Sequence, residues 1–313
     1  MLLPGGRAGC ALPQSAGFIW ATVSLMIFSG WFVITRFSVT HELRIWDIMA
    51  LRFGVGAAVL APTILRPGSR LSIAAWSEGL LFCLLWGLPF VLLVALGIRL
   101  TSAAEAASVA PAAMPVFAGI VSALVLGERQ GKARWLGYGA IVLGLICLVE
   151  VSAANHGPPD PIGLLALLGA GLLWAVYTIV FRRSGLSPMQ AAALTCTWSA
   201  VLFLPVYLLL GLSRLPLAPP SELAFQVIYQ GVFMSCLAVV AFNRAVALLG
   251  PSAATAIIAL LPAVASILAI PVLGEVPLPA QWAAIVATGI GVCLAAKRPP
   301  ACFTFPNRPA KGE

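Results

Sequence analysis

Two stretches of the sequence, PVFAGIVSALVLGE at residues 115–128 and PAVASILAIPVLGE at residues 262–275, follow one pattern. Each begins with proline, continues as an apolar run and ends in Leu-Gly-Glu, and the two lie 147 positions apart. The same register continues into the next apolar run, where Trp135 corresponds to Trp282. A repeated pattern at a fixed spacing is the signature of an internal duplication.

The duplication extends over most of the chain. Gly144 corresponds to Gly291 at the same offset of 147 positions. Nearer the N-terminus the offset is 143, and three matched residues there are Trp31, Val33 and Thr35 against Trp174, Val176 and Thr178. Insertions in the loops of the second copy account for the difference of four residues. The sequence therefore predicts two copies of one unit.

The composition places both copies in a membrane. Hydrophobic residues make up 61% of the chain and charged residues 9%, whereas soluble domains have about 45–50% and about 25%. A soluble core could not bury so much apolar side chain, so the surplus must face lipid. The net charge of +8 then reflects membrane topology rather than nucleic-acid binding.

Ten apolar runs are long enough to cross the bilayer as helices, since a crossing needs about 20 residues. Their continuous apolar character, without strict alternation, favours helices over barrel strands. We predict spans at residues 17–38, 45–65, 76–98, 101–126, 133–151, 162–181, 188–210, 223–245, 251–273 and 279–296.

Each copy therefore crosses the membrane five times, which makes the second copy inverted relative to the first. The expected fold is an all-α membrane protein of ten transmembrane helices in two inverted five-helix repeats, an arrangement that recurs in secondary transporters. The predicted parts are a short cytoplasmic lead, the first repeat, a periplasmic linker, the second repeat and a basic cytoplasmic tail: residues 1–16, 17–151, 152–160, 161–296 and 297–313.

The distribution of lysine and arginine predicts the orientation. If the N-terminus is cytoplasmic, the inner segments carry thirteen of these residues and the outer loops four, with Arg52 inside a span. This positive-inside bias favours an even number of spans and two cytoplasmic termini.

Several motifs also resemble those of a known family. Leu51-Arg52-Phe53, the stretch TSAAEAASVAPAAMPVFAGIVSALVLGERQ and its echo PSAATAIIALLPAVASILAIPVLGE are similar to the EamA-type drug/metabolite transporter superfamily. The likeness spans roughly residues 17–298. It implies a bacterial inner-membrane carrier, commonly an exporter of amino acids or related metabolites, but it implies no particular substrate.

The repeated motif suggests two structural roles. Pro115 and Pro262 are expected to interrupt their helices, because proline removes a backbone hydrogen bond, and they are candidate gating hinges or merely shape the bundle. The Gly-Glu pairs are expected to end helices and to brace the loops that follow, with glycine as the usual C-terminal stop. These pairs are Gly127, Glu128, Gly274 and Glu275.

Two ionisable residues within spans are candidates for a substrate site, because charges in the membrane are costly. Arg52 and Glu105 lie at similar depth and could form a salt bridge or hold a substrate carboxylate and amine. Glu105 also fits a capping box at a helix start, Ser102-Ala-Ala-Glu105. Arg52 could instead pair with Asp47 or reach toward lipid headgroups.

Aromatic and amide residues near the middle or inner end of spans are further candidates for lining a substrate cavity. The alternative is that they pack between helices and bond their polar atoms locally. These residues are Trp31, Trp86, Trp174, Tyr177 and Asn243.

No enzyme signature is present. The chain has no G-x-S-x-G, P-loop or paired-aspartate motif, only two histidines, and seven singly placed cysteines without metal-binding spacing. We therefore expect no metal, no cofactor and no nucleic-acid partner, and a secondary carrier of a small-molecule substrate in the lipid bilayer. Protons are a candidate coupling ion and a homodimer a candidate assembly. Alternatives are a carrier of drugs or lipid-linked sugars, or a non-transporting receptor or enzyme.

Overall fold

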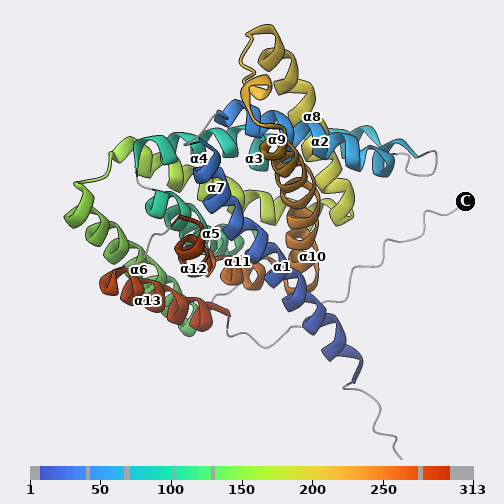
Figure 1. The fold of residues 1–313 in the computed structure, drawn as a ribbon. Helices are drawn as coiled ribbons and strands as arrows, with labels where there is room; N and C mark the ends of the chain where they lie inside the picture. Colours follow the sequence, from blue (N-terminus) through green and yellow to red (C-terminus); the bar gives the residue numbers. More distant parts are fainter. Residues whose placement is uncertain are drawn as a thin grey trace, which may run out of the picture.

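The computed structural model describes residues 8–39, 43–66, 71–101, 103–127, 131–273 and 278–296, and these residues are helical except for short connections (Figure 1). The elements in chain order are α1 (Ala8–Val39), α2 (Ile45–Leu65), α3 (Ile73–Trp86), α4 (Leu88–Leu100), α5 (Ala103–Leu126), α6 (Lys132–His156), α7 (Pro161–Ser184), α8 (Pro188–Leu209), η2 (Leu215–Leu217), α9 (Pro220–Gln226), η3 (Val227–Ala238), α10 (Val239–Leu249), α11 (Pro251–Ile258), α12 (Leu261–Leu273) and α13 (Pro279–Ala296).

These elements form the ten expected helical segments. Three segments consist of consecutive elements: α3 with α4, α9 with η3 and α10, and α11 with α12. Within the described residues, nine segments are long and apolar enough to cross a membrane, and α13 supplies an eighteen-residue tenth. The first helix begins at Ala8, inside the predicted lead, although the apolar span itself runs from Gln14 to Thr35. The all-α, ten-helix membrane fold is therefore confirmed.

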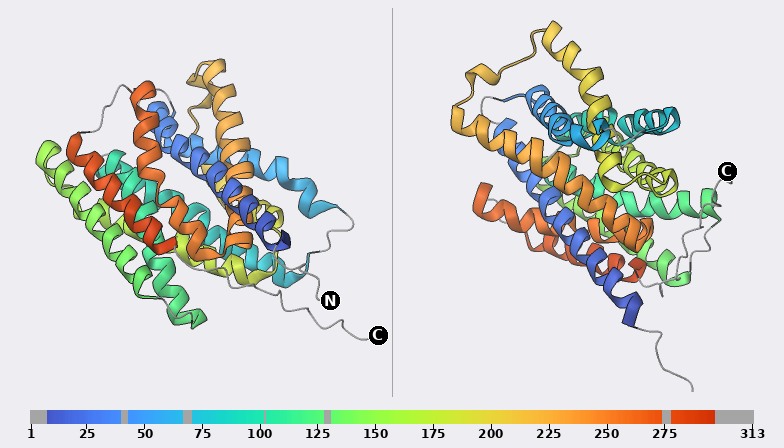
Figure 2. Two further views of the ribbon diagram at one scale, coloured as in Figure 1. Left: turned by 90° about the horizontal axis from the view of Figure 1, so that it is seen from below. Right: turned by 90° about the vertical axis from the view of Figure 1, so that its right-hand side faces the viewer.

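The two repeats are inverted, as the packing of α6 against its counterpart α13 demonstrates. A Cβ atom placed on Gly137 would lie 2.6 Å from the carbonyl oxygen of Gly291, and one on Gly144 would lie 3.0 Å from that of Ala284. Residue numbers thus rise along one helix as they fall along the other, so the helices run antiparallel side by side (Figure 2).

The same contacts confirm the offset of 147 positions. Gly137 and Ala284 are counterparts at this offset, as are Gly144 and Gly291. The contact between Gly137 and Gly291 therefore has an exact equivalent, with the repeats exchanged, in the contact between Gly144 and Ala284. This reciprocity is what a two-fold axis between the repeats produces.

The main helix contacts between the repeats show the same symmetry, in which each helix is exchanged for its counterpart. In the first repeat, α1 packs against η3, α10, α11 and α12 of the second. In the second repeat, its counterpart α7 packs against α3, α4 and α5 of the first. The counterparts α2 and α8 pack against each other, as do α6 and α13. The interior of the molecule is thus an interface between the two repeats.

The hydrogen bonds that cap the starts of α2 and α8 are equivalent at the second offset, of 143 positions. The carboxylate of Asp47 accepts a hydrogen bond from the backbone N–H of Arg44 at the start of α2, at 2.9 Å. The side-chain oxygen of Gln190 accepts one from the N–H of Ser187 at the start of α8, at 3.0 Å. Each acceptor is the third residue of its helix, which is the capping-box position. The change to an offset of 147 follows after the longer connection 210–219, which contains η2.

The prolines of the repeated motif occupy different settings. Helix α5 continues through Pro111 and Pro115, so Pro115 does not end the helix and its role as a hinge stays a prediction. In the other repeat, α11 ends at Ile258 and α12 begins at Leu261, which places Pro262 in the first turn after a break. Proline at that position loses no intrahelical hydrogen bond.

The structure describes the helix end of the repeated Leu-Gly-Glu motif only in the first repeat, and there only as far as Gly127. Gly127 follows the last residue of α5 with φ +64°, the left-handed conformation that favours glycine at a helix C-terminus. Glu128, Gly274 and Glu275 lie outside the described residues, as do the ends of the chain, 1–7 and 297–313.

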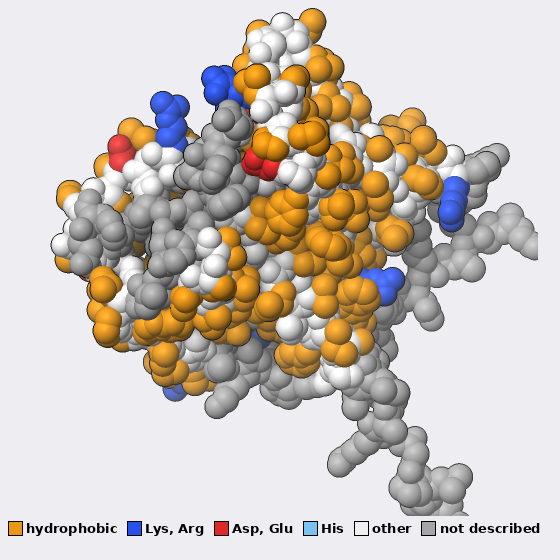
Figure 3. All heavy atoms as spheres, in the orientation of Figure 1, with side chains coloured by type: hydrophobic (Ala, Val, Ile, Leu, Met, Phe, Trp, Pro, Cys, Tyr) orange, Lys and Arg blue, Asp and Glu red, His pale blue; other side chains and the backbone are white. Residues whose placement is uncertain are grey.

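The outer surface suits a lipid environment. Leu65, Leu124, Leu143 and Leu165 are all more than three-fifths exposed. On the face shown in Figure 3, apolar side chains cover most of the described surface, and charged side chains appear only at scattered points. Such a surface is stable only where hydrocarbon replaces water.

The contact between α6 and α13 makes a stability prediction. In Gly137→Ala the new methyl group would lie 2.5 Å from the backbone nitrogen of Ala295, an atom that cannot move without displacing the helix. We expect a loss of about 1–3 kcal/mol, the usual cost of overpacking, measured as a lower thermal midpoint in detergent.

A neighbouring glycine provides the matched control. A Cβ on Gly139 meets no atom within 4 Å, so Gly139→Ala should leave the midpoint unchanged or raise it, since alanine favours helix. An equal loss in both variants would contradict the role of the close contact.

Candidate functional site

Arg52 is a charged residue buried in the interface between the repeats. It lies in the interior of α2 and is 2% exposed. Its guanidinium carbon lies 5.3 Å from the ring centroid of Trp31 and 5.5 Å from that of Phe53, within the range of cation–π attraction. Its Nη1 atom has no hydrogen-bond partner in the described part of the chain. A buried donor of this kind is costly unless something binds it.

The carboxylate that could have paired with Arg52 is used elsewhere. Asp47 Oδ1 accepts hydrogen bonds from the hydroxyl of Tyr207, at 2.6 Å, and from the backbone N–H of Arg214, at 2.9 Å. Asp47 is fully buried and ties the start of α2 to the end of α8 and the loop that follows. The predicted alternative of an Arg52–Asp47 pair is therefore wrong. Glu105 lies in α5, but its side chain is outside the described residues.

Two buried amides, one at the end of α9 and one in η3, follow on from Trp31. The indole N–H of Trp31 donates to Gln230 Oε1 at 3.0 Å, and Gln230 Nε2 donates to Gln226 Oε1 at 3.2 Å. Neither glutamine was a predicted site residue. The available signal was their presence, four residues apart, in an apolar span, where amides are expected to bond across helices.

The backbone of η3 departs from the α-helix at the same level. Residues Val227–Ala238 form a π-helix, a rare conformation that occurs frequently at functional sites. Within it, the hydroxyl of Ser235 donates to the carbonyl of Gln230, five residues earlier, at 2.8 Å, and lies 2.6 Å from the carbonyl of Arg52. Ser235 therefore links the π-helix to α2 beside the buried guanidinium.

A cluster of aromatic rings adjoins Arg52. The ring centroid of Trp86 lies 4.4 Å from that of Trp174 and 5.6 Å from that of Tyr177. Phe28, Phe90 and Phe242 also belong to the cluster, since each contacts both Trp86 and Trp174. The indole nitrogens of Trp86 and Trp174 are buried without a hydrogen-bond partner among the described residues. The cluster thus contains two unused donors, and one of them belongs to Trp86, which lines the same cavity as Arg52.

Tyr177 and Asn243, two further residues predicted to line the cavity, are hydrogen-bonded to each other. The Tyr177 hydroxyl donates to Asn243 Oδ1 at 3.0 Å, and Asn243 Nδ2 lies 2.9 Å from the same hydroxyl. Both side chains are fully buried. This pair joins α7 to α10 and satisfies its own polar groups, so it supports the packing of the site rather than offering free donors.

The space next to Arg52 is nearly closed. A cavity of about 10 Å³, enough for about one water molecule, is lined by Arg52, Phe53, Trp86, Ala192, Thr195, Cys196, Ser235 and Val239. Thr195 is the counterpart of Arg52 at the offset of 143 positions. The cavity therefore lies where the two repeats meet, with a cation from one and a hydroxyl from the other.

The structure thus brings most of the predicted cavity residues into one region. Trp31 contacts Arg52, and Arg52 shares the cavity with Trp86, which packs on Trp174 and Tyr177. The proline pair lies elsewhere, in α5 and α12, and does not line this cavity. In the described ranges, no three His, Cys, Asp or Glu side chains are grouped to hold a metal ion.

Comparisons with known proteins agree with this architecture. The chain is 26% identical over 250 residues to "Uncharacterized transporter YwfM" of Bacillus subtilis, covering 75% of this chain and 82% of that protein. It is 29% identical over 191 residues to "Probable terminal-alkyne amino-acid exporter" of Streptantibioticus cattleyicolor, covering 60% and 62%. The match thus spans less than two thirds of the exporter.

A solved structure described only as "Crystal structure of protein" has the same fold. Its TM-score is 0.69 at 21% identity, covering 91% of this chain and 99% of that one. The EamA-like transporter family matches the sequence twice, at residues 15–150 and 161–296, so each repeat corresponds to one match. With its two inverted repeats, the chain is a multi-pass membrane protein that belongs to the EamA-like transporter family.

Proposed function

We propose that this transporter exports amino acids or related small metabolites by alternating access, and that Arg52 binds the carboxylate of the substrate. The observation that carries the proposal is the burial of Arg52 between the repeats with Nη1 unpartnered. A guanidinium offers paired donors that match a carboxylate, and the interaction is strong where water is excluded. An anionic group is therefore the ligand that this site lacks.

The surroundings of Arg52 support a small amphipathic substrate. The indole N–H groups of Trp86 and Trp174 are free to donate. Thr195 lines the cavity, and because its hydroxyl already donates to the carbonyl of Ala191 at 2.8 Å, it can offer a substrate only an acceptor. The neighbouring rings offer apolar surface for the rest of the molecule. Because the cavity holds about one water molecule, the repeats must separate before a substrate enters.

The inverted symmetry supports alternating access. Equivalent helices of the two repeats surround the cavity, so opening toward one side of the membrane has a counterpart that opens toward the other. Export as the direction draws support from the relative named as a probable amino-acid exporter. The alternative substrate classes are drugs and lipid-linked sugars. A lipophilic cation is disfavoured by the charge of Arg52.

Replacing Arg52 tests the site. We expect Arg52→Gln in proteoliposomes to raise the substrate concentration for half-maximal counterflow at least about thirtyfold, the effect of losing about 2 kcal/mol or more from a buried charge pair. Arg52→Lys should be intermediate, since it keeps the charge but loses the paired donors. Transport is measured with a panel of radiolabelled amino acids and with tetraphenylphosphonium.

Two controls separate binding from folding. Arg99→Gln removes an exposed charge at the end of α4 and should leave transport unchanged. Arg52→Met should abolish amino-acid transport without lowering the thermal midpoint, because it removes a buried charged group with an unpartnered donor, and burying such a group is costly. Full transport by Arg52→Gln, or uptake of the cation alone, would refute the proposed carboxylate site.

We further propose that protons are the coupling ion and that Glu105, in α5, is the group that carries them. Glu105→Gln cannot ionise, so we expect transport driven by a proton gradient to be abolished. The measurement is gradient-driven uptake between pH 5.5 and 8 alongside counterflow without a gradient. Unchanged uptake with an unchanged pH dependence would remove Glu105 from the mechanism.

The proposed location is the bacterial inner membrane with both termini cytoplasmic. It is supported by the excess of lysine and arginine in the segments expected inside, such as Arg182 and Arg183 in the last turn of α7. A reporter fused to the C-terminus should be active only in a form that works in the cytoplasm. Activity of a periplasm-dependent reporter at that position would contradict the orientation.

A further inference from the structure

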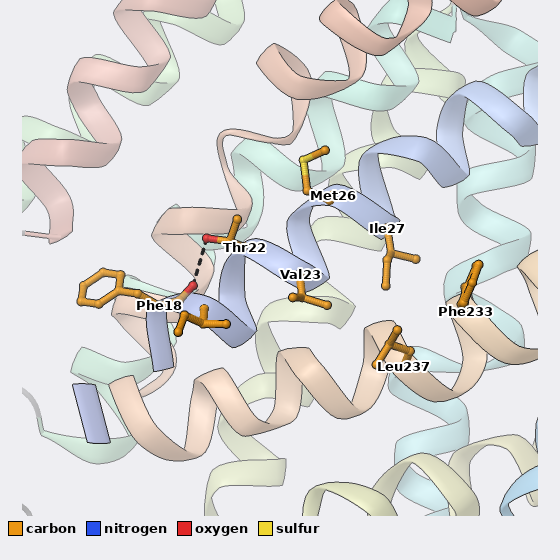
Figure 4. A pocket seen from close by; sticks show the side chains of 8 residues that line it. Phe18, Thr22, Val23, Met26, Ile27, Phe233 and Leu237 are labelled. Carbon is orange, nitrogen blue, oxygen red and sulfur yellow. Dashed lines mark hydrogen bonds between the residues drawn. The ribbon is translucent and has the colours of Figure 1, made fainter. Parts of the chain in front are cut away.

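A groove on the outside of the bundle lies between α1 and η3. Its volume is about 590 Å³, and it is lined by Phe18, Ile19, Thr22, Val23, Met26, Ile27, Phe233 and Leu237. Figure 4 shows these side chains projecting from the two helices around the groove. Six of them, Phe18, Ile19, Thr22, Met26, Phe233 and Leu237, are exposed, so the groove opens toward the lipid.

The groove offers no polar group to a ligand. Seven of its eight lining side chains are apolar. The hydroxyl of Thr22 already donates to the backbone carbonyl of Phe18 at 3.0 Å. A polar or charged solute would lose its hydration here without compensation. The chemistry that fits is hydrocarbon.

The length of the groove matches one leaflet of the membrane. From Phe18 to Ile27 the α-helix rises about 14 Å, at 1.5 Å per residue, which is about half of a hydrocarbon core about 30 Å thick. On α1 the groove begins four residues inside the span Gln14–Thr35 and ends just past the middle of that span. A single acyl chain of one leaflet therefore has the right length to fill it.

A cation marks the end of the groove where a headgroup would lie. Arg244 follows Leu237 by seven residues, which places it on the same face about two helical turns nearer the end of α10. Arg244 is exposed. Its guanidinium carbon lies 4.9 Å from the ring centroid of Trp20. Trp20 belongs to α1 and lies beside Phe18 and Ile19, where the groove begins. The described part of the chain supplies no carboxylate to Arg244. Tryptophan and arginine together are typical of the membrane interface.

We propose that this groove is a binding site for an anionic phospholipid, with one acyl chain between α1 and η3 and the phosphate at Arg244. The site is separate from the cavity at Arg52 but shares a helix with it. Phe233 and Leu237 line the groove, while Gln230 and Ser235 of the same π-helix are buried toward Trp31 and Arg52. Lipid in the groove therefore holds the helix that lines the central site, and it does so whatever the transported substrate is.

The experiment measures lipid binding directly on the purified full-length chain. The thermal midpoint in detergent is followed while phosphatidylglycerol, or phosphatidylcholine with the same acyl chains, is added. We expect stabilisation at lower concentrations of phosphatidylglycerol. In Arg244→Gln the apparent affinity for phosphatidylglycerol should fall about fivefold, the equivalent of about 1 kcal/mol for one interfacial cation. Leu237→Trp should fill the groove and reduce the stabilisation by both lipids.

Matched controls identify the groove as the cause. Arg183→Gln removes another exposed arginine, and Ile290→Trp enlarges an exposed apolar side chain on α13; both should keep the wild-type response. A diazirine-bearing acyl chain should label residues 18–27 and 233–237, and labelling should be lost in Leu237→Trp. Equal affinity for both lipids in the wild type, an unchanged response in Arg244→Gln, or labelling elsewhere would overturn the proposal.

Discussion

The structure depends on helices packing antiparallel against their own counterparts. At α6 and α13 the backbones approach so closely that a single methyl group on Gly137 would collide with the main chain of Gly291 and Ala295. Between helices in lipid there is no hydrophobic driving force, so close contact of small residues supplies the attraction. Because α2 and α8 form the equivalent contact at the centre, the same symmetry that joins the repeats at their edge also places the central cavity between them.

Symmetry of the backbone does not extend to the chemistry of the cavity. The equivalent positions beside it are Arg52 and Thr195, so only one repeat contributes a charge. The helices that flank it also differ. In the first repeat the chain breaks at Gly87, between α3 and α4, where a side chain would collide with Ser199 Oγ. The equivalent position at the offset of 147 is Met234, inside the π-helix η3. Both repeats thus interrupt the α-helix at the same depth, by different means.

The fold could be predicted from the sequence because hydrophobicity and repetition are properties of the chain itself. The ten spans, the offset of 147 and the inversion all follow from these two properties. Gly137 and Gly144 lie against the backbone of α13, a close helix contact that small residues are expected to allow. The site was predictable only in part. Burial of Arg52, Trp86 and Trp174 follows from their position in spans, but their hydrogen-bond partners depend on distant helices. Tyr207 binds Asp47 across 160 residues of sequence, and Gln230 binds Trp31 across 199. The amino-acid composition of residues 227–238 does not differ from that of an apolar α-helix, so the π-helix could not be predicted from it.

The energetics of Arg52 bear on the proposed transport mechanism. Cation–π contacts to Trp31 and Phe53 offset part of the cost of burying its charge, but the unpartnered Nη1 leaves part of that cost uncompensated. A ligand shifts a conformational equilibrium only by as much as it binds one state better than another. An anion that reaches Arg52 gains most in a conformation that surrounds it with the cavity walls. In the proposed role of Arg52 as the carboxylate-binding residue, the unpartnered Nη1 would let a bound substrate favour closure of the repeats around itself.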